Sequence, residues 1–115
     1  MYGQSLTFVA TDTFWGQVDK NDVAQGVGRE ITVDDIMYEG EWKDNKYHGF
    51  GRSMSKSEYY EGFWQDGLMH GCGQLCSDNS KHSLVGNWIK GEFQLLSNPA
   101  MKENPLLKTH WSGKR

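Results

Sequence analysis

Histidine and cysteine are the side chains of this sequence best suited to bind a metal ion or to act as base and nucleophile. His70, Cys72, Cys76 and His82 lie within one short stretch, as the ligands of a zinc site would. In an extended strand, however, His70 and Cys76 would be about 20 Å apart, whereas zinc ligands lie about 2.0–2.3 Å from one ion. Cys72 and Cys76 would be about 13 Å apart, too far for a disulfide. We therefore predict no metal site, and free thiols are typical of a reducing compartment.

No spacing of these residues points to catalysis. His48 and His70 occupy the same position in two copies of one pattern, which indicates a structural role. A catalytic site needs converging groups with tuned proton affinities, and no Ser/His/Asp or Cys/His motif is recognisable. The glycine pair at residues 26–28 lacks the remaining glycine and the helix of a dinucleotide-binding loop. We predict no catalytic residue, no cofactor and no enzyme activity.

The pattern that contains these histidines occurs twice. Residues 38–51 and 60–73 each read Tyr-x-Gly-x-Trp, then a short polar turn, then His-Gly-x-Gly. It returns after about 22 residues, a period that indicates an array of stacked structural units.

Each copy is expected to fold as a β-hairpin. Side chains alternate across a strand, so Tyr38, Gly40 and Trp42 share one face. The polar turns carry the Asn, Asp and Gly that hairpin turns favour. Glycine weakens a strand unless something approaches its backbone closely, so we expect the aromatic rings of one strand to cover the glycines of another. The residues assigned to this repeat structure are Tyr38, Gly40, Trp42, His48, Gly49, Gly51, Tyr60, Gly62, Trp64, His70, Gly71 and Gly73.

This pattern resembles the MORN repeat (membrane occupation and recognition nexus). The resemblance is strong over residues 38–51 and 60–73 and weaker on both sides. It implies an all-β fold, an elongated single-layer antiparallel sheet of successive hairpins, and no catalytic activity for the repeats. MORN-like proteins are often tied to cytoskeletal and ciliary structures, so the resemblance also implies a cytoskeleton- or cilium-associated location. A stable complex in an organelle such as the mitochondrion is the alternative.

The hairpin array is expected to fill residues 1–96 as one domain. Full repeats lie at residues 38–52 and 60–74, with degenerate or partial repeats before and after them. Residues 97–115 are expected to form a short irregular or helical tail, because Pro99 suits the first position of a helix.

The N-terminal end of the array is expected to be open. The spacing from Gly3 to Gly16 matches that from Gly73 to Gly86, so residues 1–13 correspond to the second half of a hairpin without its first half. A sheet edge presents unpaired N–H and C=O groups that invite another strand. We therefore expect a partner, or a second copy in self-association, to pair beside this edge.

Composition narrows the class of partner. The net charge of −3, with 12 basic and 15 acidic residues, is not the footprint of a nucleic-acid-binding protein. Anionic lipids typically attract a cluster of about 4–8 basic residues. The repeats contain no such cluster, so membrane lipid is not an expected partner. The first residues lack the basic region of a secretory signal, which favours an intracellular location. We predict a scaffold or adaptor subunit that contacts other protein subunits of a larger assembly. A lipid-binding membrane tether is the alternative, and an enzyme ranks third.

The face opposite the aromatic and glycine face is the candidate binding surface. Glu39 and Glu41 lie on it, as expected for a face in water, but apolar residues take the equivalent positions elsewhere. A contiguous apolar patch marks an interaction site, and aromatic residues are favoured anchors. The alternative is that the tail covers this face. The predicted protein-interface residues are Trp15, Val27, Phe50, Phe63, Val85, Ile89, Leu107 and Trp111.

Overall fold

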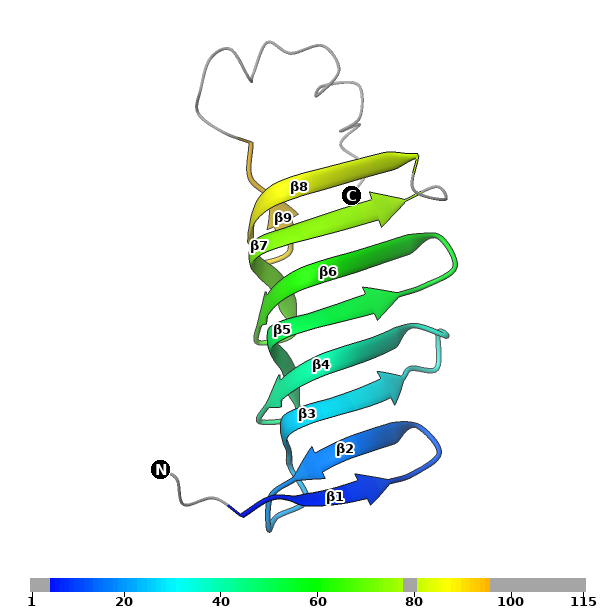
Figure 1. The fold of residues 1–115 in the computed structure, drawn as a ribbon, viewed down its shortest axis with the longest axis vertical. Coiled ribbons are helices and arrows are strands. Elements are labelled where there is room, and N and C mark those ends of the chain that lie inside the picture. Colours follow the sequence, from blue (N-terminus) through cyan, green and yellow to red (C-terminus); the bar gives the residue numbers. More distant parts are fainter. Residues whose placement is uncertain (1–4, 78–80, 96–115) are drawn as a thin grey trace.

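The computed structural model describes residues 5–77 and 81–95, which form nine β-strands in one antiparallel sheet (Figure 1). Each strand pairs with its neighbours in the sequence, so the strand order runs from β1 to β9. The strands are β1 (Thr7–Ala10), β2 (Phe14–Val18), β3 (Ala24–Ile31), β4 (Met37–Lys43), β5 (Lys46–Met54), β6 (Glu58–Gln65), β7 (Leu68–Ser77), β8 (His82–Ile89) and β9 (Glu92–Phe93). The all-β, single-layer fold predicted from the sequence is confirmed. The predicted tail at residues 97–115, with Leu107 and Trp111, lies outside the described residues.

Three hairpins end in tight two-residue turns with a left-handed backbone. Asp44 and Asn45 have φ angles of 52° and 68°, residues 66–67 have 50° and 86°, and residues 90–91 have 50° and 88°. Positive φ at both central positions defines the turn whose twist matches that of the flanking strands, and Asn, Asp and Gly adopt it most readily. The sequence of each turn therefore sets the register of its hairpin.

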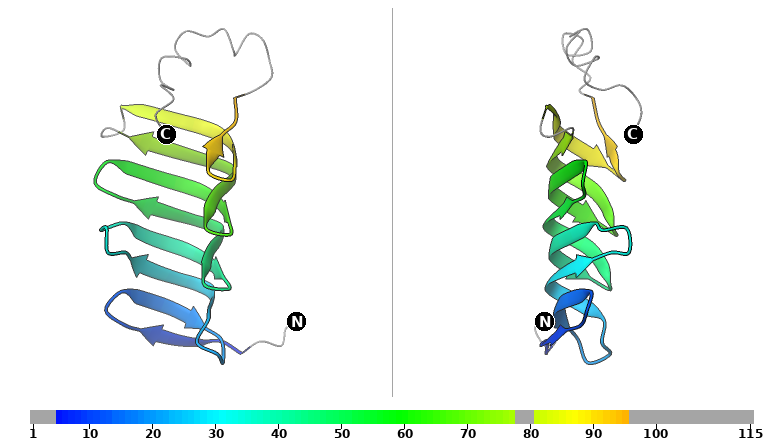
Figure 2. Two further views of the ribbon diagram at one scale, coloured as in Figure 1. Left: turned by 180° about the vertical axis from the view of Figure 1, so that it is seen from behind. Right: turned by 90° about the vertical axis from the view of Figure 1, so that its right-hand side faces the viewer.

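Each full hairpin contains a bulge next to its turn. In the first, Gly40 pairs with Gly51 and Trp42 with Tyr47, so one residue of β4 lies opposite the three residues 48–50 of β5. The second hairpin has the same shift between Gly62↔Gly73 and Trp64↔Met69. Bulges bend a strand and increase its twist. The hairpin tips therefore leave the plane of the sheet and fold over one of its faces, as the views in Figure 2 show.

The folded tips are joined to one another by backbone hydrogen bonds. In each case an N–H in one tip donates to a carbonyl near the start of the return strand of the preceding hairpin. The bonds are Asn45 N to Ala24 O (3.0 Å), Gly67 N to Tyr47 O (3.0 Å) and Gly91 N to Met69 O (2.8 Å).

The hydrophobic core lies on the inner face of the sheet, the face that the tips cover. Tyr38, Tyr60 and Trp88 are its most buried large side chains, at most 2% exposed. Aromatic rings can each bury about 150–250 Å², so they supply most of the burial in the described part of the chain, which forms a single sheet. The buried cluster consists of Ala24, Tyr38, Trp42, Tyr60, Trp64, Leu75, Leu84 and Trp88.

Candidate functional site

The inner face shows why each repeat ends its pattern with glycine. A Cβ atom placed on Gly51 would overlap the Tyr38 hydroxyl and come within 2.5 Å of the ring carbon Cζ. A Cβ atom on Gly73 would meet Tyr60 in the same way, also 2.5 Å from Cζ. Both full repeats therefore pack a tyrosine ring directly on a glycine of the neighbouring strand, as expected from the sequence.

The glycines of the first strand are required for a second reason, which is close approach of two backbones. A Cβ atom on Gly40 would lie 2.6 Å from the carbonyl oxygen of Phe50, and one on Gly62 would lie 2.5 Å from that of Cys72. These contacts occur beside the bulges, at the pairs Gly40↔Gly51 and Gly62↔Gly73. Any side chain at these two positions would force the hairpin apart.

The polar atoms of the buried rings are mostly satisfied by backbone carbonyls. The Tyr38 hydroxyl donates to Glu41 O at 2.7 Å, and the Tyr60 hydroxyl donates to Phe63 O at 2.9 Å. Burial raises the pKa of Tyr60 to about 12, and it raises the pKa of Tyr38 still further. Both phenols therefore stay neutral at physiological pH.

The tryptophan of each repeat contacts the hairpin before it. Trp64 Nε1 donates to Gly51 O at 3.1 Å, and Trp88 Nε1 donates to Gly73 O at 3.2 Å. The equivalent atom of Trp42 is buried and has no hydrogen-bond partner among the described residues. Trp42 faces the degenerate hairpin formed by β2 and β3, where its Nε1 would lie only 3.0 Å from a Cβ atom on Gly28.

Gly49 and Gly71 do not have the role that we expected for them. They lie in the bulges with φ angles of 70° and 87°, a left-handed backbone that glycine adopts without steric cost. A Cβ atom on Gly49 would meet the carboxylate of Glu41, and one on Gly71 would meet Phe63 Cβ at 3.4 Å, so no buried ring covers either glycine. The prediction was wrong because it assumed regular alternation along the return strand, which the bulge interrupts.

The two histidines of the repeat also lie in the bulges. His70 Nδ1 accepts a hydrogen bond from the backbone N–H of Lys90 at 3.4 Å, which ties the second hairpin to the tip of the next. His48 is half-buried at the same position of the first hairpin. In the parts of the chain that the structure describes, no three His, Cys, Asp or Glu side chains are grouped to hold a metal ion. The described residues also include no helix of the length and apolar character needed to cross a membrane.

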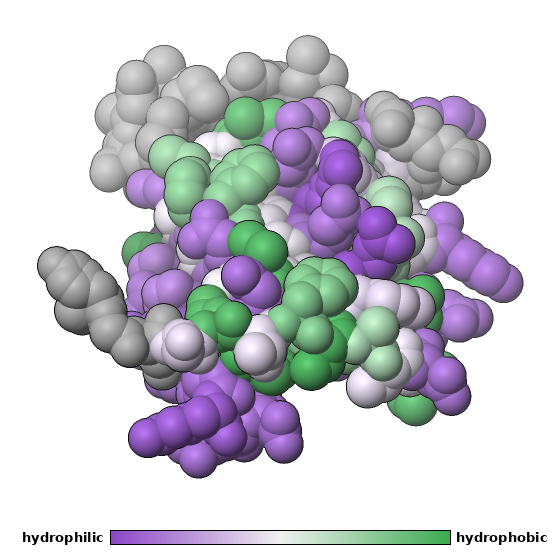
Figure 3. Space-filling model, turned by 60° about the horizontal axis from the view of Figure 1, so that its bottom comes forward, coloured by the Kyte–Doolittle hydropathy of each residue, from purple (hydrophilic) through white to green (hydrophobic). Residues whose placement is uncertain are grey.

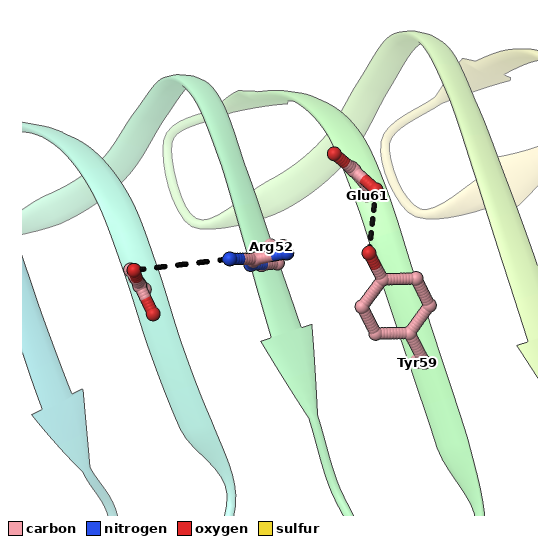
Figure 4. Close-up of polar contacts among 4 residues, drawn as sticks. Arg52, Tyr59 and Glu61 are labelled. Atoms are coloured by element: carbon pink, nitrogen blue, oxygen red, sulfur yellow. Dashed lines mark hydrogen bonds and ion pairs between the residues drawn. The ribbon is translucent and has the colours of Figure 1, made fainter.

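The outer face, which is turned toward the viewer in Figure 1, carries a row of alternating charges across its centre. Arg29, Glu39, Arg52 and Glu61 are successive neighbours in the strand register. The Arg52 guanidinium lies 3.9 Å from Glu39, and Tyr59 donates its hydroxyl proton to Glu61 (Figure 4). That hydrogen bond to Glu61 raises the pKa of Tyr59. Exposed ion pairs contribute about 0–1 kcal/mol, so this charge row shapes the surface more than it stabilises the fold.

Phe50 and Phe63 lie beside the charge row and contact each other. They are directly opposite in the register of β5 and β6, with ring centroids 5.5 Å apart and ring planes at 74°. Their exposed fractions are 44% and 47%. Two aromatic rings therefore form one exposed apolar pair near the middle of the outer face.

A second apolar group lies at the β1 end of the outer face. Phe8, Trp15 and Val27 line a shallow hollow together with Arg29 and Glu39 of the charge row. Figure 3 views the molecule from this end and shows apolar side chains gathered over it. Phe8 is the most exposed of the three, at 68%.

The structure places the described residues of the predicted interface on the outer face but divides them into separate groups. Glu41 lies between Val27 and Phe50 on this face, and Cys72 of β7 lies beyond Phe63. Val85 is isolated on β8, and Ile89 lies near the tip of the last hairpin, opposite Glu92. The groups are Phe8–Trp15–Val27, Phe50–Phe63, Val85 and Ile89.

Three outer-face residues were missed by the sequence prediction. Met54 and Tyr59 are paired in the register of β5 and β6, and Phe8 of β1 is paired with Gln17 of β2. The signal was present in the alternation of the strands. Counting every second residue outward from Arg52 and Glu61 reaches Met54 and Tyr59.

A hollow of about 240 Å³ lies on the inner face within the second repeat. Trp64, Met69 and Trp88 form its apolar wall, and Ser53 and Glu58 approach it from the other end of the strands. Met69 occupies the position that Tyr47 has in the first repeat.

The MORN repeat family model matches residues 38–56 and 60–81. These are the two hairpins with complete ring-on-glycine packing. The chain contains two MORN repeats. MORN repeats are generally associated with protein–protein or membrane contacts and are typically non-catalytic. No curated protein matches the chain significantly.

Proposed function

We propose that this MORN-repeat protein is a non-enzymatic scaffold or adaptor subunit that binds another protein through the outer face of its sheet. The observation that carries the proposal is the Phe50–Phe63 pair, in which two contacting rings are 44% and 47% exposed. Among the described residues, no second layer covers this face. Exposed aromatic residues are favoured anchors of protein interfaces, so a partner that covers both rings gains from burying them.

The charge row supports a protein partner over a lipid surface. Arg29, Glu39, Arg52 and Glu61 alternate in sign, so they present no patch of one charge to anionic headgroups. Polar groups around an apolar centre are typical of protein interfaces and set orientation and specificity. Arg52 and Glu61 are the neighbours of Phe50 and Phe63 in this arrangement.

The test is quantitative co-purification from the cells that make the protein, comparing two double variants. Phe50→Glu/Phe63→Glu places two charges in the apolar pair, and both side chains are exposed enough for the fold to tolerate the change. Val33→Glu/Leu68→Glu is the matched control, because these residues are also exposed, at 99% and 46%, and lie outside the predicted interface. Thermal unfolding of both variants must first show that they remain folded.

We expect Phe50→Glu/Phe63→Glu to lose at least one specific partner of the wild-type chain while the control retains it. Retention of every partner by both variants would refute a role for this face. Binding of anionic liposomes by the purified chain, abolished by salt, would replace the scaffold with a membrane tether.

A further inference from the structure

The two edges of the described sheet differ in how they are protected from other strands. β9 consists of two residues and includes the exposed charge of Glu92, and short charged edges discourage pairing. Beyond it the chain continues into residues that the structure does not describe. β1 at the opposite edge has four residues, Thr7–Ala10, with no charge, no proline and an exposed Phe8. Within residues 5–77 and 81–95, the β1 edge is thus the one that lacks the usual protection.

The hydrogen-bonding groups at the open side of β1 follow from its register with β2. Thr11 N donates to Phe14 O at 2.7 Å, which makes Thr11 and Phe14 a hydrogen-bonded pair. Hydrogen-bonded and non-bonded pairs alternate along antiparallel strands, so Val9↔Gly16 is bonded and Phe8↔Gln17 is not. The N–H and C=O groups of Phe8 therefore point away from β2, toward the open edge.

We propose that two copies of the chain pair through β1, antiparallel, about a twofold axis that passes Phe8. A twofold axis places a strand antiparallel to its own copy, and an interface of this kind uses the same surface on both copies. With Phe8 on the axis, each Phe8 exchanges backbone N–H and C=O hydrogen bonds with the other. No charge of β1 opposes this approach, because the strand has none.

The side chains favour the same register. Opposite residues of an antiparallel pair point to the same face of the sheet, so the two Phe8 rings would lie against each other on the outer face. This repeats across the axis the arrangement that Phe50 and Phe63 have within the sheet. Phe8 is 68% exposed in the single copy, and the pairing buries it on both sides. The two shallow hollows formed with Trp15 and Val27 become neighbours across the axis.

The first test measures the mass of the purified chain by light scattering and by sedimentation over a range of concentrations. We expect a reversible dimer of twice 13.1 kDa for the wild type. Phe8→Lys brings two positive charges together at the axis and should raise the dissociation constant at least tenfold. Val85→Lys is the matched control, because Val85 is 67% exposed on the same face but far from β1; it should leave the constant within about twofold.

The second test measures the register by disulfide trapping in a Cys72→Ser/Cys76→Ser background. Phe8→Cys places a thiol opposite its own copy, within the range that a disulfide spans, and should trap a covalent dimer. Ala10→Cys is on the same strand and face, but its two thiols would be about 13 Å apart at the strand rise, so it should not. A wild-type chain that stays monomeric at about millimolar concentration, a dimer indifferent to Phe8→Lys, or trapping through Ala10 instead of Phe8 would overturn the proposal.

Discussion

The two full repeats have the same ring-on-glycine packing but differ at the second residue of the return strand. In the first repeat, Tyr47 stacks on Tyr38, with ring centroids 3.7 Å apart and planes at 4°, and donates its hydroxyl proton to Glu30 at 2.7 Å. In the second repeat, Met69 takes this position and lines the inner hollow. Methionine is unbranched and flexible and fills irregular space. The repeat therefore requires its glycines, whereas this position accepts either a stacking ring or a flexible side chain that fills space.

The repeats also differ in what each tryptophan finds on the preceding hairpin. Trp64 rests on the first full repeat and donates to its Gly51 carbonyl, whereas Trp42 rests on the degenerate hairpin and leaves its N–H unpaired among the described residues. Val18 stands in that degenerate hairpin where the pattern has Trp. A degenerate repeat therefore changes the hydrogen bonding of the tryptophan in the next repeat along the array.

The largest expected effect is the loss of a ring-on-glycine contact, which should be equal in the two repeats. Gly51→Ala and Gly73→Ala each place a methyl group inside the volume of a buried tyrosine. We expect overpacking to lower the free energy of unfolding by about 3 kcal/mol in each case. Urea unfolding of the purified variants measures this.

Gly67→Ala is the control for backbone strain without overpacking. Gly67 has a φ of 86°, but an added Cβ would meet no described atom within 4 Å. Its loss should be about 1 kcal/mol, the cost of a left-handed alanine. If Gly51→Ala destabilises no more than Gly67→Ala, the ring-on-glycine account fails.

A smaller effect is expected from exchanging the residues that distinguish the repeats. Tyr47→Met removes the stack on Tyr38 and the hydrogen bond to Glu30, and should destabilise by about 2 kcal/mol. Tyr47→Phe keeps the ring and should cost only about half as much. Met69→Tyr should be neutral or slightly stabilising, because its ring would enter the inner hollow. A large loss from Met69→Tyr, measured by thermal unfolding, would show that the second repeat cannot accept the first repeat's packing.

Alkaline pH should destabilise the protein, with the first repeat contributing more than the second. Burial raises the pKa of Tyr38 and Tyr47 in the first repeat and that of Tyr60, to about 12, in the second. Above pH 10 the unfolded chain releases these protons while the folded chain keeps them, so the free energy of unfolding falls as pH rises from about 10 to 12. Each such tyrosine contributes a slope of up to about 1.4 kcal/mol per pH unit.

Urea titrations between pH 8 and pH 12 check this alkaline slope. Tyr47→Phe should make the slope shallower by about one proton. Tyr60→Phe should do the same for the second repeat over its own range, up to about pH 12. A wild-type stability that stays constant up to pH 11.5 would contradict the buried, neutral phenols.

The smallest expected effect concerns the two tryptophan N–H groups. Trp64→Phe loses ring area and the bond to Gly51, whereas Trp42→Phe loses ring area only. Trp64→Phe should therefore be more destabilising by about 1 kcal/mol, the usual net value of a hydrogen bond. Equal losses in thermal or urea unfolding would indicate that Trp42 Nε1 has a partner in solution.

The class of fold follows from the amino-acid sequence alone, because the signals for it are local. The alternation of Tyr38, Gly40 and Trp42, and the turn residues Asp44 and Asn45, specify a hairpin from neighbouring residues alone. The recurrence of this unit then specifies a single meandering sheet. The placement of Tyr38 over Gly51 also followed from the sequence, because a ring and a bare backbone are complementary.

Only the three-dimensional structure shows which glycines contact a ring, which adopt a left-handed backbone, and which apolar side chains contact one another. The bulge at residues 48–50 depends on how two strands cross, and it converts Gly49 from a packing surface into a left-handed backbone position. The same bulge turns Phe50 outward against Phe63, while Val85 remains apart. Alternation can assign residues to a face, but only the register and bend of the strands determine their neighbours on that face.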